Sequence, residues 1–308
     1  HDSSLKLAKD FGLFYRNKVE TICSNLSEAP VGVRRPIPAG IVTDALDSLR
    51  PVSVDEVMSI ILKSPTKSCN LDPIPTRLLK QCLPVVVPAI TSIINTTFES
   101  GTVPSSLKLA NIRPILKKPG LDKNAMQNYR PISNLPFLSK VMERAAFSRL
   151  TDHLLDNEIL DSHQSAYRAH HSVETVLVSL TDHFLKQMDE GNLTALVLLD
   201  VSSAFDTVLH SLMIDRLKEF GVTSTALRWF ISYLSDRFQR VCIDGVKSDA
   251  TPLTYGVPQG SVGGPLLFSI YTQPLGELIK RHNVGHHSYA DDIQLFISFP
   301  PCGHNLMS

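Results

Sequence analysis

The stretch SYADDIQLFISF, residues 288–299, sets two adjacent carboxylates, Asp291 and Asp292, between short runs of strand-forming residues. Its β-branched and aromatic content predicts a strand–turn–strand hairpin with the acids at its tip. A hairpin tip keeps acids in water, so this pair alone is better explained as a solvated turn than as a site. A further carboxylate upstream changes that balance.

That carboxylate is Asp200, which ends the run ALVLLD at residues 195–200. A continuous apolar run of this length is typical of a strand buried on both faces. If this strand and the hairpin are neighbours in one sheet, Asp200 joins Asp291 and Asp292 in one site. Clustered carboxylates raise one another's pKa unless a cation lies between them. Hard oxygen ligands suit Mg²⁺, and two such ions about 3.5–4 Å apart serve phosphoryl transfer.

Five motifs in order resemble the reverse transcriptase of non-LTR (LINE-type) retrotransposons. Three of them resemble the polymerase palm: LLDVSSAFDTV at 198–208 (motif A), YGVPQGSVGGPLLFSIY at 255–271 (motif B) and YADD at 289–292 (motif C). Two lie upstream and resemble the fingers and the motif that follows them: IRPILKKPG at 112–120 with NYRPISNLPFLSKVMER at 128–144, and HQSAYRAHHSVET at 163–175. Each motif is weak alone, and their order and spacing carry the resemblance.

The resemblance implies an α+β right-hand polymerase fold with fingers and palm. The family's palm and thumb continue beyond motif C, whereas this chain stops sixteen residues after Asp292, so we expect the thumb to be absent or truncated and synthesis to be weakly processive. The chain is then divided into four segments: a helical N-terminal extension and linker at 1–50, a helical segment preceding the fingers at 51–105, fingers with a basic surface at 106–190, and a palm truncated after motif C at 191–308.

The same resemblance implies a role for each matching residue. The implied function is RNA-directed DNA polymerisation with an RNA template, a DNA primer, deoxynucleoside triphosphates and two Mg²⁺ ions, with Mn²⁺ as an alternative. The implied catalytic residues and metal ligands are Asp200, Asp291 and Asp292, with the Val201 carbonyl as a further ligand. The implied nucleotide-binding residues are Lys117, Lys118, Arg130, Phe205 and Gln259, where Phe205 would favour deoxynucleotides. The implied template contacts are Gln164 and Arg168.

Each of these residues also has a plain structural explanation. Phe205 fits a core position as well as a pocket, and Gln259 between Pro258 and Gly260 fits a turn. The alternative for the whole chain is a catalytically inactive retrotransposon relic that at most binds nucleic acid. An RNA-templated RNA polymerase would share the palm carboxylates, but Phe205 disfavours it. The glycine at 263, where the family usually carries a larger residue, removes no catalytic group.

Charge is unevenly distributed along the 308 residues. The whole chain has 30 basic and 30 acidic residues, whereas residues 101–150 hold nine basic and two acidic residues, a local charge of +7. Because this segment coincides with the expected fingers, we expect a phosphate-binding surface there. A hydrophobic content of 43% and a charged content of 19% indicate a globular protein with a sizeable core.

Cysteine and histidine spacing predicts neither a disulfide framework nor a histidine metal site. The five cysteines are scattered, which suits a reducing compartment, and we expect an intracellular protein of the cytoplasm or nucleus. The pairs His170–His171 and His286–His287 would point to opposite faces of a strand, so neither pair chelates readily. No stretch approaches the roughly 20 apolar residues of a membrane span.

The remaining elements follow from capping and periodicity. We expect a helix from Ser3 or Ser4 to about Glu28, a linker over 30–40, and a capping box of Ser53 and Glu56 opening another helix. Further helices are predicted to start at about Thr76 and at Pro88, the latter ending near Gly101. Strands are predicted at 112–116 and 129–133, helices at 137–155, 172–191, 211–220, 225–234 and 262–275, and a β-hairpin before motif B.

Overall fold

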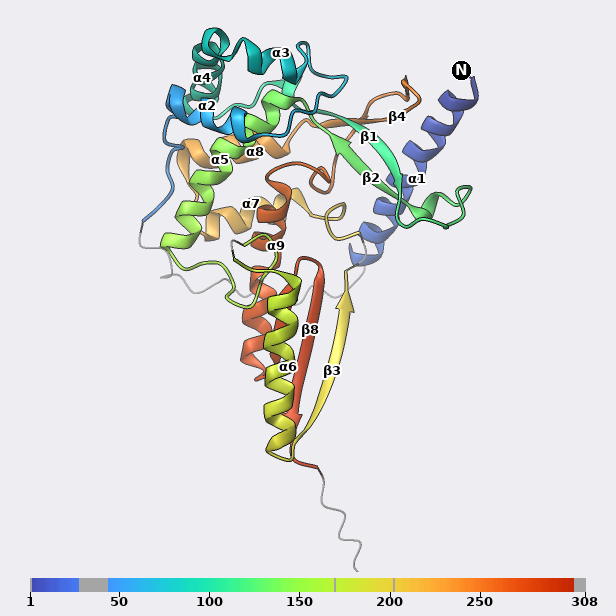
Figure 1. Cartoon of the computed structure of the whole chain (residues 1–308), viewed down its shortest axis with the longest axis vertical. Coiled ribbons are helices and arrows are strands. Elements are labelled where there is room, and N and C mark those ends of the chain that lie inside the picture. The colour runs from blue at the N-terminus through green and yellow to red at the C-terminus, as the bar shows by residue number, and fades with distance from the viewer. Residues whose placement is uncertain (1, 28–43, 169, 202, 302–308) are drawn as a thin grey trace, which may run out of the picture. The chain divides into compact units, whose positions relative to one another are not determined.

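The computed structural model describes residues 2–27, 44–168, 170–201 and 203–301 (Figure 1). The chain forms two compact units, each discontinuous in sequence. The first unit comprises residues 1–159 and 205–267, and the second comprises residues 160–204 and 268–308. Both combine helices with β-sheet, so the fold is of the α+β class.

The helices and strands of the first unit are bounded as follows. Its helices are α1 (Asp2–Ser27), α2 (Val54–Lys63), α3 (Thr76–Gln81), α4 (Leu83–Ser100), α5 (Phe137–Asp156), α7 (His210–Glu219) and α8 (Ser224–Leu234), with 3₁₀ turns η1 (Ser105–Leu107) and η2 (Met126–Asn128). Its strands are β1 (Leu109–Leu116), β2 (Tyr129–Asn134), β4 (Phe238–Ile243), β5 (Val246–Lys247) and β6 (Thr251–Pro252). Helix α9 (Gly264–Arg281) begins in this unit and continues into the second.

A five-stranded sheet in the first unit joins the predicted fingers strands to the hairpin before motif B. Strand β1 pairs antiparallel with β2 and parallel with β4, while β5 and β6 both pair with β4. Helix α1 packs Phe11 and Tyr15 against Ile112 and Val241 of this sheet. The N-terminal helix and the strands predicted at 112–116 and 129–133 are therefore confirmed as secondary structure, because their apolar residues find a common core.

Helices α4, α5 and α8 of this unit meet at the single tryptophan. Trp229 of α8 is fully buried, and its ring stacks on that of Tyr233 with centroids 5.5 Å apart. Phe98 of α4 and Phe147 of α5 meet Trp229 edge-on, at 6.0 and 6.4 Å. Edge-to-face and offset contacts of this kind add to the stability given by apolar burial. The predicted helix around Trp229 is thus part of the core.

One helix start differs from its prediction. Helix α4 begins at Leu83 and contains Pro88 in its interior, whereas the sequence predicted a start at Pro88. Pro84 lies in the first turn, where no N–H partner is needed, so the helix tolerates it. Gly101 ends the helix with a φ of 66°, as predicted, because glycine adopts this left-handed conformation without strain. The linker predicted over 30–40 lies outside the described residues.

The second unit is a three-stranded antiparallel sheet with helices α6 and part of α9. Its elements are α6 (Val173–Asp189), β3 (Leu193–Asp200), β7 (Gly285–Tyr289) and β8 (Asp292–Phe299), with the strand order β3–β8–β7. Ser172 and Thr175 form a capping box at the start of α6. Phe184 of α6 meets Phe296 of β8 edge-on at 5.6 Å, which explains why α6 runs beside the strands in Figure 1.

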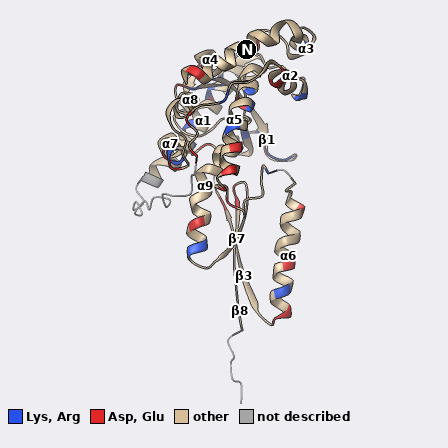
Figure 2. Ribbon diagram, turned by 90° about the vertical axis from the view of Figure 1, so that its left-hand side faces the viewer, with Lys and Arg blue, Asp and Glu red and all other residues tan. Residues whose placement is uncertain are grey.

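The prediction that β3 is buried on both faces is wrong. Seven of its eight residues are exposed, Leu198 by 69% and Val197 by 50%. Among the described residues β3 is an edge strand, which pairs with β8 on one side only. An apolar run indicates a preference for burial, but it does not determine whether other elements pack against both faces of the strand. Figure 2 shows the strands of this sheet almost free of charged residues, whereas α6 carries both signs.

Candidate functional site

The three palm carboxylates meet at one end of the second unit's sheet. Asp200, the last residue of β3, lies directly opposite Asp292, the first residue of β8. Tyr289 pairs with Asp292 across the hairpin, which leaves Ala290 and Asp291 as a two-residue turn. The predicted hairpin is confirmed, and so is the expectation that its strand neighbours the one ending in Asp200.

Electrostatic repulsion is already visible within this group. Partial burial, and then the charges of Asp291 and Asp200, raise the pKa of Asp292 above its ordinary value. A divalent cation would reverse this effect, because an opposite charge favours the ionised carboxylate. The donor set consists of hard oxygens in reach of solvent, which fits Mg²⁺ better than a softer metal. Val201 follows β3 directly, where its carbonyl can serve as a further ligand.

The turn that carries Asp291 is held by Gln164. The Gln164 side-chain oxygen accepts from the Ala290 N–H at 3.1 Å, and its amide nitrogen donates to the Ala290 carbonyl at 3.3 Å. Ala290 has a φ of 57°, which is uncommon for a residue with a Cβ, so these two bonds stabilise a strained turn. Gln164 is 8% exposed. Its buried amide positions the turn, and its contact with template stays a prediction.

Arg168, the other predicted template residue, bonds to its own loop. Its guanidinium donates to the carbonyls of Asp161, Ser162 and Gln164 at 3.2–3.4 Å. The loop is also tied to β7, because Ser165 N–H donates to the Ser288 carbonyl at 3.0 Å. Arg168 therefore shapes the segment that holds the Ala290 turn.

Tyr167 is close enough to Asp291 to interact with its charge, and it was not predicted. Burial, and then the charge of Asp291, raise the pKa of the Tyr167 phenol. Its side chain is nevertheless 57% exposed, with a backbone φ of 63°. The sequence could have indicated Tyr167, because it lies between Gln164 and Arg168 in the motif at 163–175 that was predicted to contact the template.

In the first unit, motifs A and B are joined through their backbones. The Val257 N–H donates to the Phe205 carbonyl and the Gly256 N–H to the Val208 carbonyl, both at 2.8 Å. Gly256 has a φ of 80°, and a Cβ there would lie 2.6 Å from the Asp206 carbonyl oxygen. Only glycine allows this approach. The two motifs are thus held in register, although they are about 50 residues apart in sequence.

Gln259 is oriented by an acid that the sequence analysis did not single out. Its amide nitrogen donates to both carboxylate oxygens of Asp206, each at 2.8 Å. Burial raises the pKa of Asp206 to about 6, while the Gln259 hydrogen bond and the charge of Lys18 act in the opposite direction. Both residues line a cavity of about 70 Å³ together with Tyr15.

Phe205 is half-buried, and it is absent from the described lining of this cavity. Its backbone oxygen binds Val257, so its position is fixed relative to Gln259 two residues further on. The structure therefore places Phe205 beside the motif B turn, and its predicted role against the ribose stays a prediction.

The predicted phosphate-binding cations are exposed. Lys117 and Lys118 follow β1, and Arg130 lies on β2 opposite Ile115. Because side chains alternate along a strand, Arg113, Lys117 and Arg130 share one face of the β1–β2 pair. We call Arg113, Lys117 and Arg130 the basic strand face.

Two of the nine cations counted between residues 101 and 150 are not on a surface. Lys108 is 6% exposed, and Arg149 is 4% exposed and forms an ion pair with Glu56. Arg149 also donates to the carbonyls of Arg50, Pro51 and Ala145. The local charge count therefore overestimated the basic surface, because Lys108 and Arg149 are buried.

The motif B turn rests on a second residue that the sequence analysis missed. Glu143 of α5 is fully buried and accepts from the Val262 N–H at 2.7 Å and from the Ser139 hydroxyl at 3.1 Å. Burial raises its pKa. A Cβ on Gly263 would lie 2.1 Å from the Phe147 ring, so that ring fills the space of the larger residue expected there.

The chain also matches known proteins. A family model described as reverse transcriptase (RNA-dependent DNA polymerase) matches residues 115–305. The chain is similar to a probable RNA-directed DNA polymerase from transposon BS of Drosophila melanogaster, with 33% identity over 267 residues, or 82% of this chain and 28% of that protein. It is also similar to an RNA-directed DNA polymerase from mobile element jockey of the same organism, with 30% identity over 79% of this chain and 27% of that protein.

A probable RNA-directed DNA polymerase from transposon X-element of Drosophila melanogaster is 31% identical over 79% of this chain and 26% of that protein. The chain thus spans about a quarter of the length of these relatives. No helix among the described residues is long and apolar enough to cross a membrane.

Proposed function

Because the chain belongs to the reverse transcriptase family of RNA-dependent DNA polymerases, and within it to the non-LTR retrotransposon type, we propose that it adds deoxynucleotides to a primer 3′-hydroxyl on an RNA template. The observation that carries this proposal is the register of β3 and β8, which sets Asp200 opposite Asp292 with Asp291 in the adjoining turn. Three carboxylates gathered at one end of a sheet are better explained as a site for phosphoryl transfer than as acids of a solvated turn.

In this proposal Asp200, Asp291, Asp292 and the Val201 carbonyl hold two Mg²⁺ ions. When bound, the ions supply charge neutralisation at the attacking and leaving oxygens. The protein's own contribution is positioning. The Gln164 amide fixes the Ala290 turn, and with it the direction in which Asp291 points.

We assign the incoming nucleotide to the side of motif B. Gln259 lines the nucleotide pocket with its amide fixed by Asp206, and Phe205 excludes the ribose 2′-hydroxyl. Arg130, Lys117 and Lys118 bind the triphosphate, for which their exposure and like charge suit them. Gln164 and Arg168 approach the template strand. A Phe205→Val variant is then expected to incorporate ribonucleotides more readily than the wild type.

We further assign the fingers to residues 106–190 and the palm to residues 191–308. The basic strand face lies in the proposed fingers, and all three carboxylates lie in the proposed palm. Exchange of residues 106–190 for those of a relative would then change nucleotide affinity while leaving the metal requirement unchanged.

The decisive experiment is primer extension on a homopolymer RNA template with Mg²⁺. We expect extension by the wild type and its loss in Asp291→Ala. Asp182→Asn is a matched control, because this exposed acid lies on α6 and pairs only with Lys186 among the contacts described. Extension that survives in Asp291→Ala would refute the assignment of the carboxylates.

A second candidate is nucleic-acid binding without catalysis, which the basic strand face favours. Its members Arg113, Lys117 and Arg130 project from one face of a strand pair, as a phosphate backbone requires. Under this reading Asp200→Ala and Asp291→Ala leave RNA binding unchanged. Lys117→Ala with Arg130→Ala weakens it and reduces its salt dependence, and the absence of extension in the wild type would favour this candidate.

A further inference from the structure

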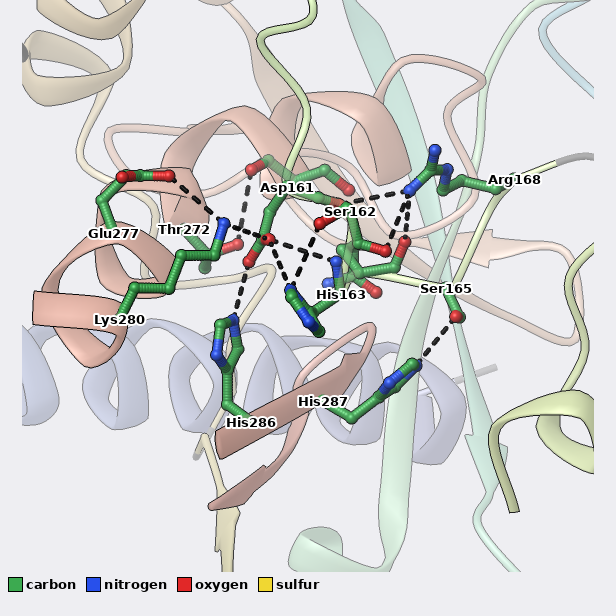
Figure 3. Close-up of polar contacts among 12 residues, drawn as sticks. Asp161, Ser162, His163, Ser165, Arg168, Thr272, Glu277, Lys280, His286 and His287 are labelled. Carbon is green, nitrogen blue, oxygen red and sulfur yellow. Dashed lines mark hydrogen bonds and ion pairs between the residues drawn. The ribbon is translucent and has the colours of Figure 1, made fainter. Parts of the chain in front are cut away.

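Two histidines and an aspartate, none of which has been assigned a role in polymerisation, converge in the second unit. Asp161 and His163 lie in the loop that follows α5, and His286 lies on β7 (Figure 3). The potential ligand atoms of the three residues all lie within 4.8 Å of one another. The expectation that no histidine metal site exists rested on neighbours in sequence. The chain instead pairs His286 with residues more than a hundred positions upstream.

The two oxygens of Asp161 have different partners. Oδ1 accepts from the His163 N–H at 3.1 Å and from the Lys280 ammonium at 3.2 Å. Oδ2 faces Nε2 of His286 at 2.9 Å. One oxygen is therefore held by donors of the protein, while the other is free to leave its histidine for a metal. Outer contacts of this kind orient ligands in metal sites.

Helix α9 brings its backbone close to this pair because it has a glycine there. A Cβ at Gly276 would lie 2.1 Å from Asp161 Oδ2 and 3.3 Å from His286 Nε2. Any side chain at this position would press on both atoms. The close approach of helix α9 to Oδ2 and Nε2 thus depends on Gly276.

The third candidate ligand lies on the solvent side of the pair. His163 is 48% exposed at its side chain, and its Nδ1 lies 3.5 Å from Asp161 Oδ1. Its ring centroid is 4.8 Å from that of the buried His286. An ion between the two rings would therefore keep one position open to water. The Lys280 charge opposes a cation, but it is 38% exposed and bonds to the other oxygen, so solvent screens it.

We propose that Asp161 Oδ2, His163 Nδ1 and His286 Nε2 bind one Zn²⁺ ion. Two imidazoles and a carboxylate form a donor set that suits zinc, with water as the fourth ligand. Mg²⁺ is a poor fit because it prefers oxygen ligands. Tetrahedral zinc with bonds of about 2.0–2.2 Å requires ligand atoms roughly 3.3 Å apart, a small adjustment of the present contacts.

The ion would fasten the loop of residues 161–168 to β7. That loop carries Gln164, which holds the Ala290 turn, so zinc would stabilise the hairpin without taking part in the chemistry. Affinity would fall at acid pH, because protons compete for both imidazoles.

The test is Zn²⁺ titration by calorimetry and by thermal melting, with Mg²⁺ present in excess. We expect one equivalent to bind the wild type and to raise Tm. His163→Ala removes an exposed ligand without disturbing the core and should weaken binding at least about tenfold, within the range seen when metal sites are perturbed. His282→Ala removes an exposed histidine outside the cluster and should change nothing.

Two further variants separate the zinc site from other sites. Asp291→Ala should retain the zinc equivalent, which distinguishes it from binding at the palm carboxylates. His286→Gln should lose it, and His163→Ala decides the matter if His286→Gln fails to fold. A wild type that binds no zinc, or a His163→Ala variant that binds as tightly as the wild type, would overturn the proposal.

Discussion

Gln259 and Asp206 form a two-bond contact in which one amide nitrogen donates to both oxygens of a carboxylate, each at 2.8 Å. The contact joins the motif B turn to Asp206 within motif A. The contact also fixes the orientation of the Gln259 side-chain amide, because its nitrogen is bound to Asp206. The side-chain oxygen of Gln259 takes no part in this contact.

Asp206 should make stability fall as the pH rises. Its pKa is raised to about 6, so between about pH 4 and pH 7 the native state holds a proton that the unfolded chain has lost. We expect this carboxyl to reduce the free energy of unfolding by up to about 3 kcal/mol over that window. Urea denaturation at several pH values checks it in the wild type and Asp206→Asn. Parallel pH profiles of the two proteins would contradict the prediction.

Removal of one palm carboxylate should stabilise the metal-free protein. Burial and the charges of Asp291 and Asp200 raise the pKa of Asp292, so the ionised form carries a cost above that pKa. Asp292→Asn should therefore raise Tm in EDTA at neutral pH, and it should reduce the further rise that Mg²⁺ gives the wild type. Asp182→Asn is the control. An equal response to Mg²⁺ in Asp292→Asn and wild type would be inconsistent with a shared site.

Gly263→Ala should destabilise the first unit by about 1–3 kcal/mol, the usual cost of overpacking a core. The added Cβ would lie 2.1 Å from the Phe147 ring, which itself packs against Trp229. Gly12→Ala is the matched control, because its Cβ would meet nothing nearer than 3.7 Å. Chemical denaturation measures both. Combining Gly263→Ala with Phe147→Leu should recover part of the loss, and no recovery would argue against the contact.

Glu56→Ala should cost about 3 kcal/mol, because it leaves the charge of Arg149 buried without its ion-pair partner. The Arg149 hydrogen bond, against the opposing effect of burial, lowers the pKa of Glu56. The stabilisation is therefore present above the ordinary pKa of a glutamate and is lost as the pH falls through the lowered value. Denaturant titrations at neutral and acid pH test both statements. A loss that is equally large in acid would show that Glu56 acts through packing alone.

The sequence predicted best where a short motif determined the local structure. The hairpin of residues 288–299 and the strand ending at Asp200 were both found from apolar residues placed beside an acid. The predicted start of α4 was wrong, because it was set at Pro88, whereas the helix begins at Leu83 with Pro84 in its first turn, a position that fits proline. Boundaries of this kind depend on capping that a pattern does not reveal.

Burial and partners could not be predicted, since they depend on residues distant in sequence. Arg149 counts as a surface charge until Glu56 is found beside it. His286 has no ligand partner until residues 161–163 are brought to β7. Gln164 was assigned to template, and its amide is used to hold a turn 126 positions away. In each case the residue type indicated the kind of interaction, but the partner residue is distant in sequence and is identified only by the fold.

The pairing of Asp200 with Asp292 also bears on how this protein is made. On a ribosome that adds about 5–20 residues per second, β8 is completed roughly 5–20 s after β3, since the two acids are 92 positions apart. During that interval the apolar strand β3 lacks its hydrogen-bonding partner, which favours association between nascent chains. Slower translation would lengthen the wait, so the yield of folded protein should depend on elongation speed between these two strands and on the chaperones that attend the nascent chain.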